Sequence, residues 1–337
     1  MNFIRRYVYY LILTSIFCFP SCAKGDKLPI IKETILRTED VIKGKDQSLI
    51  QLLQKVRGSV GKRSSGSKAI WSRKDDFGLG IYLSANHVYG VSSWGTRNAR
   101  YFNIKTEKVG VFERSQIPPI DGKIDLGKTL IADFPLLHFD ISNNATDQTI
   151  LPAEDFYLGI VDNQRKEQSL LSEHPEAVDT DSPLQLYDPT NRTIASKTWN
   201  NPIAGQYAIG VGFPQDMINY PNGAVVYAKI LTDNEAEQAI IQLKGMNDVE
   251  ENIPYNSNVE FFIQESAVEG MSGGGVFNSE GQLLGIMVRS SDTQNAPKIT
   301  RVVKLSYIRT KMLTYFNNLP VQDKLILQPF LSGELVD

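Results

Sequence analysis

The chain has 337 residues, of which 42% are hydrophobic and 22% are charged, and its formal net charge is -3. This composition is typical of a globular protein that is long enough for two packed units. The basic residues are scattered, with only short pairs such as Lys62-Arg63, so the charge pattern excludes an ordinary nucleic-acid-binding surface.

Residues 1–22 have the layout of a secretory signal peptide. Arg5 and Arg6 precede an apolar run over residues 7–19, which is too short to span a bilayer comfortably. Pro20-Ser21-Cys22 resembles the end of a bacterial lipobox, although Phe19 departs from it; cleavage after Ala23 is the alternative. The sequence therefore predicts an exported protein, either a periplasmic or cell-envelope lipoprotein anchored through Cys22, or a secreted protein.

The cysteine and histidine content predicts neither a disulfide nor a metal site after export. The only cysteines, Cys18 and Cys22, both lie in the leader. The three histidines share no ligand spacing, and no phosphate loop or cofactor motif is present. We therefore expect no cofactor.

Residues 23–66 form a lead-in with one expected helix. Leu49, Leu52, Leu53 and Val56 recur at helical spacing, and Asp46 or Ser48 is the expected N-cap. A small, polar stretch over residues 58–66 predicts a flexible connection to the part that follows.

Short apolar runs separated by turn residues characterise the chain from residue 67 onward. The expected strands span residues 80–83, 128–131, 207–212, 224–230, 259–263, 275–278 and 283–288. Long helical patterns do not alternate with these runs, which favours an antiparallel sandwich or barrels over a parallel sheet. Residues 141–205 are polar and predict an elaborated loop or small subdomain.

The end of the chain predicts one helix followed by a tail. Leu305, Ile308, Met312 and Phe316 fall on one helical face, as in a helix that packs on the sheets. Residues 317–337 contain no further pattern and are expected to form a C-terminal tail.

A serine in a glycine-rich turn is the candidate nucleophile. Gly270-Met271-Ser272-Gly273-Gly274-Gly275 runs into an apolar strand, where the amides of Gly270 and Ser272 are candidates for an oxyanion hole. An ordinary turn also fits these residues. The segment matches the nucleophile elbow of α/β-hydrolases too, but those enzymes place the histidine after the serine, whereas all three histidines here precede Ser272.

His87 and Asp133 are the candidate partners of the serine. His87 directly follows the expected strand 80–83, whereas His138 lies in an apolar run and His174 in a polar loop. Asp133 lies among apolar neighbours, where a buried carboxylate needs a partner such as an imidazole. Asp121, Asp125 and Asp140 are alternatives in more polar surroundings.

The order His87, Asp133, Ser272 resembles that of the chymotrypsin-like (trypsin-like) serine endopeptidases, in particular exported bacterial members. Ser84-Ala85-Asn86-His87 is similar to the family's Thr-Ala-Ala-His, and residues 133–137 to its Asp-Ile-Ala-Leu-Leu. Residues 270–274 are similar to its Gly-Asp-Ser-Gly-Gly, and residues 283–286 to its Leu-x-Gly-Ile. The resemblance spans about residues 68–316.

This resemblance implies an all-β fold with two antiparallel six-stranded β-barrels and a C-terminal helix. The protease domain would span residues 67–316, with the polar insertion at about 141–205, and the triad would lie between the barrels. Ser272 would attack an acyl carbon, His87 would transfer its proton, and Asp133 would orient His87.

The chain departs from the family at three points: residues 141–205 are longer than the family's connection between barrels, and Met271 and Gly275 differ in the serine turn. Met271 replaces the aspartate that pairs with a newly cut N-terminus in digestive members, so we expect an oxyanion hole that forms without such processing. Gly275 replaces the usual proline. By alignment to the serine, Ser266 and Ala267 line the base and wall of the primary pocket, which has no acidic residue to bind Lys or Arg. Lys298 would approach the same pocket from a later strand and favour acidic side chains; an exposed loop lysine is the alternative.

The sequence thus predicts a serine endopeptidase that acts on proteins or peptides and contacts a membrane only through an N-terminal lipid anchor. A catalytically silent, protease-like binding protein and an esterase on the same fold are the alternatives.

Overall fold

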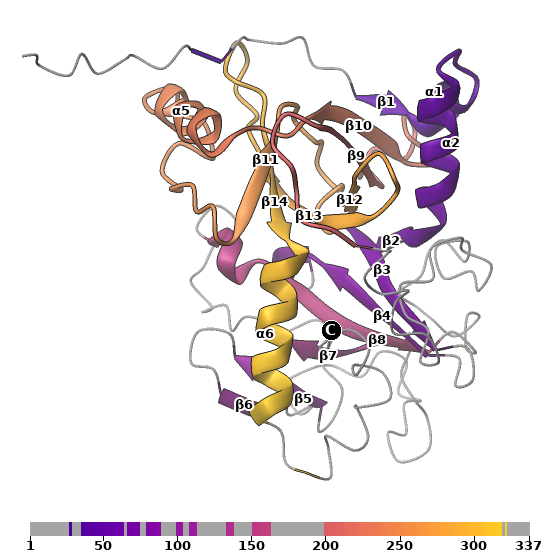
Figure 1. The fold of residues 1–337 in the computed structure, drawn as a ribbon, viewed down its shortest axis with the longest axis vertical. Helices are drawn as coiled ribbons and strands as arrows, with labels where there is room; N and C mark the ends of the chain where they lie inside the picture. The colour runs from indigo at the N-terminus through magenta and orange to yellow at the C-terminus, as the bar shows by residue number, and fades with distance from the viewer. Residues whose placement is uncertain are drawn as a thin grey trace, which may run out of the picture.

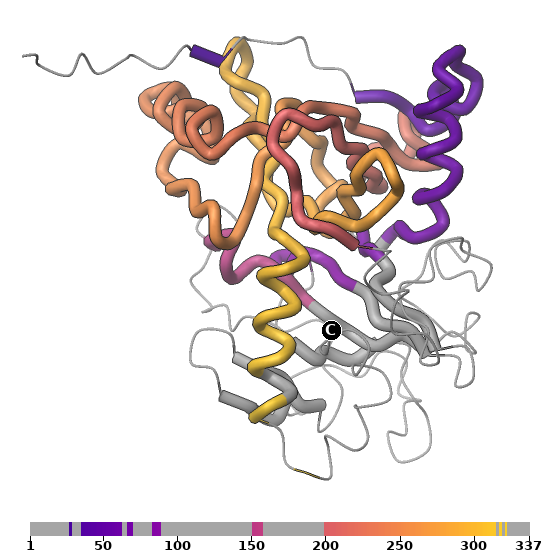
Figure 2. The backbone as a smooth tube through the Cα atoms, in the orientation of Figure 1, coloured from indigo at the N-terminus to yellow at the C-terminus, as the bar shows by residue number. Residues whose placement is uncertain are grey.

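Two large antiparallel sheets, one above the other in Figure 1, and a two-stranded sheet organise the part of the chain that the computed structural model describes. The described residues are 27–28, 35–63, 66–74, 79–88, 99–103, 108–112, 133–137, 150–162, 199–318 and 321. The candidate signal peptide, the expected strand 128–131, His138 and His174 lie outside them, as does the tail apart from the end of the last helix and residue 321. Figure 2 traces the same path from indigo to yellow.

The C-terminal sheet has seven strands in the order β1-β10-β9-β12-β13-β14-β11. These strands are β1 (Leu36–Arg37), β9 (Tyr207–Gly212), β10 (Ala224–Lys229), β11 (Glu260–Ile263), β12 (Gly275–Phe277), β13 (Leu283–Ser290) and β14 (Thr300–Lys304). A further bridge between Ile230 and Ile263 joins the end of β10 to β11, so β9 to β14 close on themselves. Closure explains why β11 and β12 are buried along their whole lengths.

The N-terminal strands form two smaller sheets. The first has five strands in the order β2-β3-β4-β8-β7, and the second pairs β5 with β6. Their bounds are β2 (Val60–Arg63), β3 (Gly66–Lys74), β4 (Leu79–Ser84), β5 (Ala99–Asn103), β6 (Lys108–Phe112), β7 (Asp133–Leu137) and β8 (Tyr157–Asp162). The expected six-stranded N-terminal barrel is therefore seen, over the described residues, as an open sheet and a hairpin.

One strand lies where the sequence predicts a loop. β8 falls inside the polar segment 141–205, yet it pairs with β4 on one side and β7 on the other. The apolar run from Phe156 to Val161 is short and flanked by long polar stretches, which explains why a strand was not expected there. Part of this segment, β8, is therefore an inner strand of the sheet and not an inserted loop.

The lead-in is tied to both sheets. α1 (Thr38–Ile42) and α2 (Gln47–Val56) are followed by the 3-10 turn η1 (Arg57–Ser59), and the chain then enters β2. The carboxylate of Asp46 accepts the Leu49 amide at 3.0 Å, which confirms one of the two expected caps. Leu53 and Val56 are fully buried in the same core cluster as Phe277. The expected helix of the lead-in is therefore part of the core.

The last helix covers the junction of the sheets. α6 (Leu305–Asn318) runs down from β14 along the front of the molecule in Figure 1. Leu305, Ile308 and Met312 are buried, as predicted, while the side chain of Phe316 is outside the described set. No helix among the described residues is long and apolar enough to cross a membrane.

Two of the described helices were not predicted, the short α1 and the longer α5. α5 (Asp233–Leu243) begins with a capping box, in which Thr232 accepts the Glu235 amide at 3.2 Å and the Glu235 carboxylate accepts the Thr232 amide at 2.8 Å. Thr232-x-x-Glu235 was the available sequence signal.

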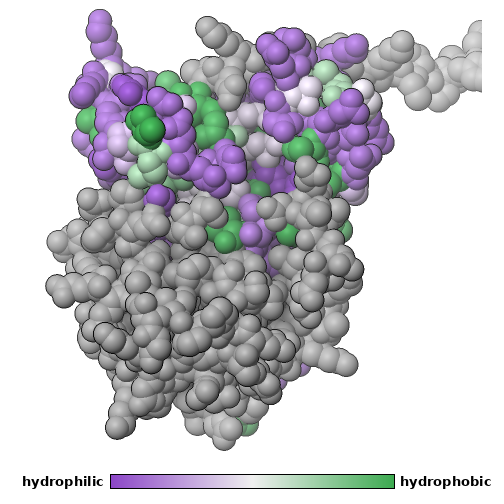
Figure 3. Space-filling view, turned by 180° about the vertical axis from the view of Figure 1, so that it is seen from behind, coloured by the Kyte–Doolittle hydropathy of each residue, from purple (hydrophilic) through white to green (hydrophobic). Residues whose placement is uncertain are grey.

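Seen from behind, the described surface is mainly hydrophilic, with smaller apolar groups between the polar ones (Figure 3).

Candidate functional site

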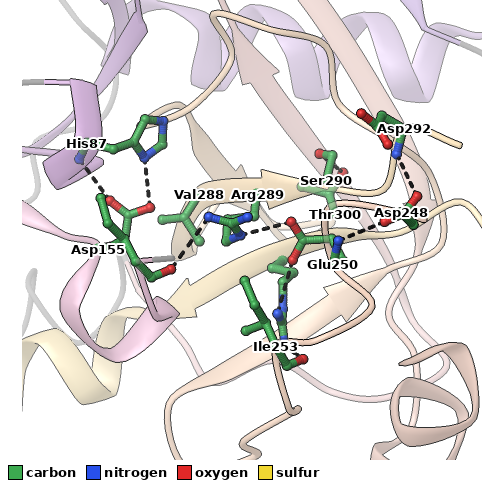
Figure 4. Close-up of polar contacts among 12 residues, drawn as sticks. His87, Asp155, Asp248, Glu250, Ile253, Val288, Arg289, Ser290, Asp292 and Thr300 are labelled. Atoms are coloured by element: carbon green, nitrogen blue, oxygen red, sulfur yellow. Dashed lines mark hydrogen bonds and ion pairs between the residues drawn. The ribbon is translucent and has the colours of Figure 1, made fainter. Parts of the chain in front are cut away.

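A histidine–aspartate pair lies at the junction of the two sheets. His87 is in a helical turn that starts at Asn86, directly after β4 and Ala85. Its Nδ1 lies 2.7 Å from Oδ2 of Asp155, and its backbone amide donates to Oδ1 of the same carboxylate at 2.9 Å (Figure 4). The Asp155 side chain is 0% exposed and that of His87 is 17% exposed. This geometry fixes the orientation of the ring, with Nδ1 directed at the carboxylate.

The loop that carries Asp155 is held from two sides. Asp155 follows the 3-10 turn η5 (Pro152–Glu154), and the side-chain amide of Asn86 donates to the Glu154 carbonyl at 3.3 Å. From α6, the Tyr307 hydroxyl donates to the Ala153 carbonyl at 3.2 Å. The Tyr307 ring also packs edge-on against Phe156, with centroids 5.9 Å apart. The carboxylate is thus placed by both β4 and the C-terminal helix.

Asp155 occupies the position that the sequence analysis gave to Asp133. Asp133 starts β7, where it is paired with Val161 of β8, and its side chain is outside the described set. Asp155 and Asp133 both precede short apolar strands that are neighbours in one sheet, so local sequence did not separate them. The hydrogen bonds from His87 to Asp155 do separate them.

The loop around Ser272 packs against the segment that leads to His87. Ser272 Oγ lies 3.4 Å from the Val288 carbonyl of β13, and its own carbonyl accepts the amide of Ser67 from β3 at 2.8 Å. A methyl group on Gly273, which has φ +86°, would lie 2.1 Å from the Ser67 carbonyl oxygen and 2.9 Å from the Ala85 amide nitrogen. Only glycine allows this approach. The nucleophile candidate is thereby placed next to the chain segment of its expected base.

Every carbonyl from residue 269 to residue 272 has a hydrogen-bond donor. The Glu269 carbonyl accepts the Gln215 amide at 2.9 Å, and the Met271 carbonyl accepts the Gly274 amide at 2.9 Å. The carbonyls of Gly270 and Ser272 are both held by Ser67. Among the described residues, no acceptor is bonded to the amides of Gly270 and Ser272.

The direction of the Gly270 amide follows from the hydrogen bond that the preceding carbonyl accepts. In a trans peptide the N–H points opposite to the C=O, so the Glu269–Gln215 bond directs the Gly270 amide away from Gln215. Gly270 has φ +95°, and a methyl group on it would lie 2.3 Å from the Gln215 nitrogen. Among the described residues, the amides of Gly270 and Ser272 therefore have no acceptor, and both remain candidates for an oxyanion hole.

The expected pocket residues bond to the start of β14 and to the loop that joins β13 to β14. Ser266 is buried, and its hydroxyl donates to the Ser291 carbonyl at 2.8 Å. The Ala267 amide donates to Thr300 Oγ1 at 2.8 Å. Lys298 is half-buried, and its ammonium group contacts the Thr293 carbonyl at 3.5 Å. These contacts leave the preference for acidic side chains a prediction.

A buried ion-pair network adjoins the site through β13. Arg289, which follows Val288, pairs with Glu250 at 2.8 Å (Figure 4). Arg301 of β14 pairs with Glu250 and Glu260 at 3.0 Å each. Burial raises the pKa of Glu260 to about 7, although the Arg301 charge acts in the opposite direction. Burial likewise raises the pKa of Glu250.

Arg289 also reaches the segment that precedes Asp155. Its guanidinium lies 3.5 Å from the Ile150 carbonyl. Local sequence patterns do not reveal this network, because its members are far apart in the chain and only folding brings them together.

Comparison with known proteins gave structural matches only. No family model matches the chain, and no curated protein matches its sequence. The active form of the Rv3671c protease from M. tuberculosis is 14% identical, with a TM-score of 0.40 over 86% of this chain and 91% of that one. The serine endoprotease from Yersinia pestis is 18% identical, with a TM-score of 0.37 over 80% and 66% of the two chains.

A third solved structure, the HtrA-type protease AlgW with a decapeptide, is 13% identical, with a TM-score of 0.35 over 75% of this chain and 52% of that one. The chain is thus similar in structure to bacterial serine endoproteases, at low sequence identity. We infer its function from the residues around Ser272.

Proposed function

We propose that the protein is a serine endopeptidase in which Ser272 is the nucleophile, His87 the general base and Asp155 the carboxylate that orients His87. The single observation that carries this proposal is the convergence of the His87–Asp155 pair and the Ser272 loop on one junction. The amides of Gly270 and Ser272, which have no acceptor among the described residues, would supply the donors that acyl transfer needs.

The roles follow from ordinary acyl-transfer chemistry. Nε2 of His87 takes the Ser272 proton as the hydroxyl attacks the scissile carbonyl carbon, and it later gives that proton to the leaving amine. The amides of Gly270 and Ser272 stabilise the oxygen that becomes negative. Asp155 stabilises the imidazolium through Nδ1, and its complete burial strengthens this interaction because little water screens it.

The oxyanion hole is proposed to be formed without proteolytic activation. Met271 is 0% exposed and packs in the core of the C-terminal sheet. A methyl group on Gly212 of β9 would lie 2.9 Å from Met271 Cα, so the two backbones are in close contact. Apolar packing thus anchors this turn, and no new N-terminus is needed to hold it.

The substrate is proposed to be a protein or peptide outside the cytoplasm. The leader supports export, and Pro20-Ser21-Cys22 supports a lipid anchor on Cys22. Loss of radiolabelled palmitate incorporation in Cys22→Ser would support the anchor, and unchanged incorporation would contradict it.

A fluorophosphonate probe tests the catalytic proposal. The wild type should be labelled covalently, and Ser272→Ala should not. Ser279→Ala is the matched control, because Ser279 is an exposed serine in the turn after β12. A folded wild type that no fluorophosphonate labels would contradict the proposal and favour a binding protein. Labelling with cleavage of small esters, but of no peptide or protein, would favour an esterase.

A further inference from the structure

Ser67 of β3 connects the two sheets through its amide and its hydroxyl group. β3 lies against β9 where the sheets meet (Figure 1). The Ser67 amide donates to the Ser272 carbonyl at 2.8 Å, and its hydroxyl donates to the Gly270 carbonyl at 2.8 Å. The same hydroxyl accepts the Phe213 amide at 2.8 Å, and the side chain is 0% exposed.

These bonds fix the two peptide units that flank the dipeptide Met271-Ser272. Glycine at 270 has φ +95° and little intrinsic preference for one backbone conformation, so its neighbours must hold it. The Ser67 hydroxyl is the only donor to the Gly270 carbonyl among the described residues. Because that carbonyl faces a buried hydroxyl, it is not free to turn toward the reacting oxygen.

We propose that Ser67 is a positioning residue that aims the Gly270 and Ser272 amides at the developing oxyanion, an inference that rests on the proposed serine endopeptidase function. The Phe213 amide completes the arrangement, because it donates to the Ser67 hydroxyl and so directs the hydroxyl proton toward Gly270. Ser67 touches no substrate in this scheme.

The start of β3 is close both to the residue after His87 and to the Ser272 loop. A methyl group on Gly66 would lie 2.6 Å from one Val88 methyl carbon and 3.0 Å from the Ser272 carbonyl oxygen. The first residue of β3 therefore packs between Val88 and the loop that carries Ser272. The strand that positions the amides also sets their place relative to the base.

Ser67→Ala removes the hydroxyl and keeps the backbone amide. We expect kcat for a peptide substrate to fall about 10- to 100-fold, somewhat less than the loss of a whole oxyanion-hole donor, with KM nearly unchanged. The rate of fluorophosphonate labelling should fall in proportion, since the phosphonyl oxygen uses the same amides.

Ser84→Ala is the matched control. Ser84 is also fully buried, and its hydroxyl donates to the Ser67 carbonyl at 2.6 Å, but it touches neither loop carbonyl. We expect a similar loss of thermal stability with a change in kcat of less than about threefold. Ser67→Thr keeps a hydroxyl and should restore most of kcat. If Ser67→Ala does not fold, Ser67→Cys, whose thiol is a weak donor, should give an intermediate kcat.

The outcomes separate this inference from the proposed function. A labelled wild type with equal kcat losses in Ser67→Ala and Ser84→Ala would overturn the role of Ser67 and leave the protease intact. A rise in KM without a change in kcat would also overturn it. A folded wild type that is never labelled would overturn both.

Discussion

The His87 ring and the buried carboxylate of Asp155 are joined at two points: Nδ1 lies 2.7 Å from Oδ2, and the His87 amide donates to Oδ1 at 2.9 Å. The ring bond alone would let the His87 backbone shift relative to Asp155. The second bond, from the His87 amide, holds that backbone to the same carboxylate. Both the ring and the backbone of His87 are therefore bonded to one buried carboxylate.

Asp155→Asn should abolish most of the activity while keeping the fold. The asparagine amide cannot stabilise the imidazolium and favours the wrong tautomer, so we expect kcat to fall by about 10⁴-fold. Steady-state kinetics with a peptide substrate measure this loss. Asp133→Asn is the control, and we expect it to change kcat little. Loss of activity in Asp133→Asn, with an active Asp155→Asn, would restore the assignment made from sequence.

Local sequence alone does not distinguish Asp133 from Asp155 as the partner of His87. Asp133 and Asp155 stand before two short apolar runs, and a single sequence does not say which run ends beside His87. β8 adds to the difficulty, because its six residues lie in a polar segment. The decisive contact joins residues that are 68 positions apart, and only the sheet order brings them together.

The C-terminal sheet was more accessible to prediction. Its strands are β-branched and separated by turn residues, so most of their bounds agree within one or two residues. Ser272, Gly270 and His87 could be chosen because their local sequences carry the chemistry. Ser67 and Arg301 could not, since a lone serine or arginine in a strand carries no such signal until its partners are known.

Gly270→Ala should destabilise the protein and abolish labelling. Alanine at φ +95° is strained, and its methyl group would lie 2.3 Å from the Gln215 nitrogen. Gly205→Ala is the control, because Gly205 has φ +85° but nothing within 4 Å of the added methyl group. We expect about 1–2 kcal/mol of lost stability for Gly205→Ala and about 1–3 kcal/mol more for Gly270→Ala. Urea unfolding measures both, and equal losses would contradict the tight packing.

Arg301→Met should lower stability strongly. Arg301 is 0% exposed and neutralises Glu250 and Glu260, so its removal leaves two buried carboxylates with less compensation. We expect a loss of about 3–5 kcal/mol in urea unfolding near neutral pH. Arg37→Met, which removes an exposed ion pair with Asp40, should have little effect. Comparable losses in the two variants would show that burial of the network contributes nothing.

Glu260→Gln should remove a pH-dependent part of the stability. Burial raises the pKa of Glu260 from 4.5 to about 7, so folding favours its protonated form. That contribution is complete below about pH 4.5 and is lost as the pH rises through about 7. The stability of the wild type relative to Glu260→Gln should therefore fall across this window, as measured by urea unfolding at a series of pH values.

Glu235→Gln provides a control of opposite sign. Desolvation tends to raise the pKa of Glu235, but hydrogen bonds from Thr232 and Lys229 outweigh it, and the pKa is lowered. Its contribution is therefore present above the ordinary pKa and is lost only as the pH falls through the lowered value. The wild type should lose stability relative to Glu235→Gln in acid, where the Glu260 contribution is complete. A pH profile for Glu260→Gln that parallels that of Glu235→Gln would show that Arg301, and not burial, controls the Glu260 carboxyl.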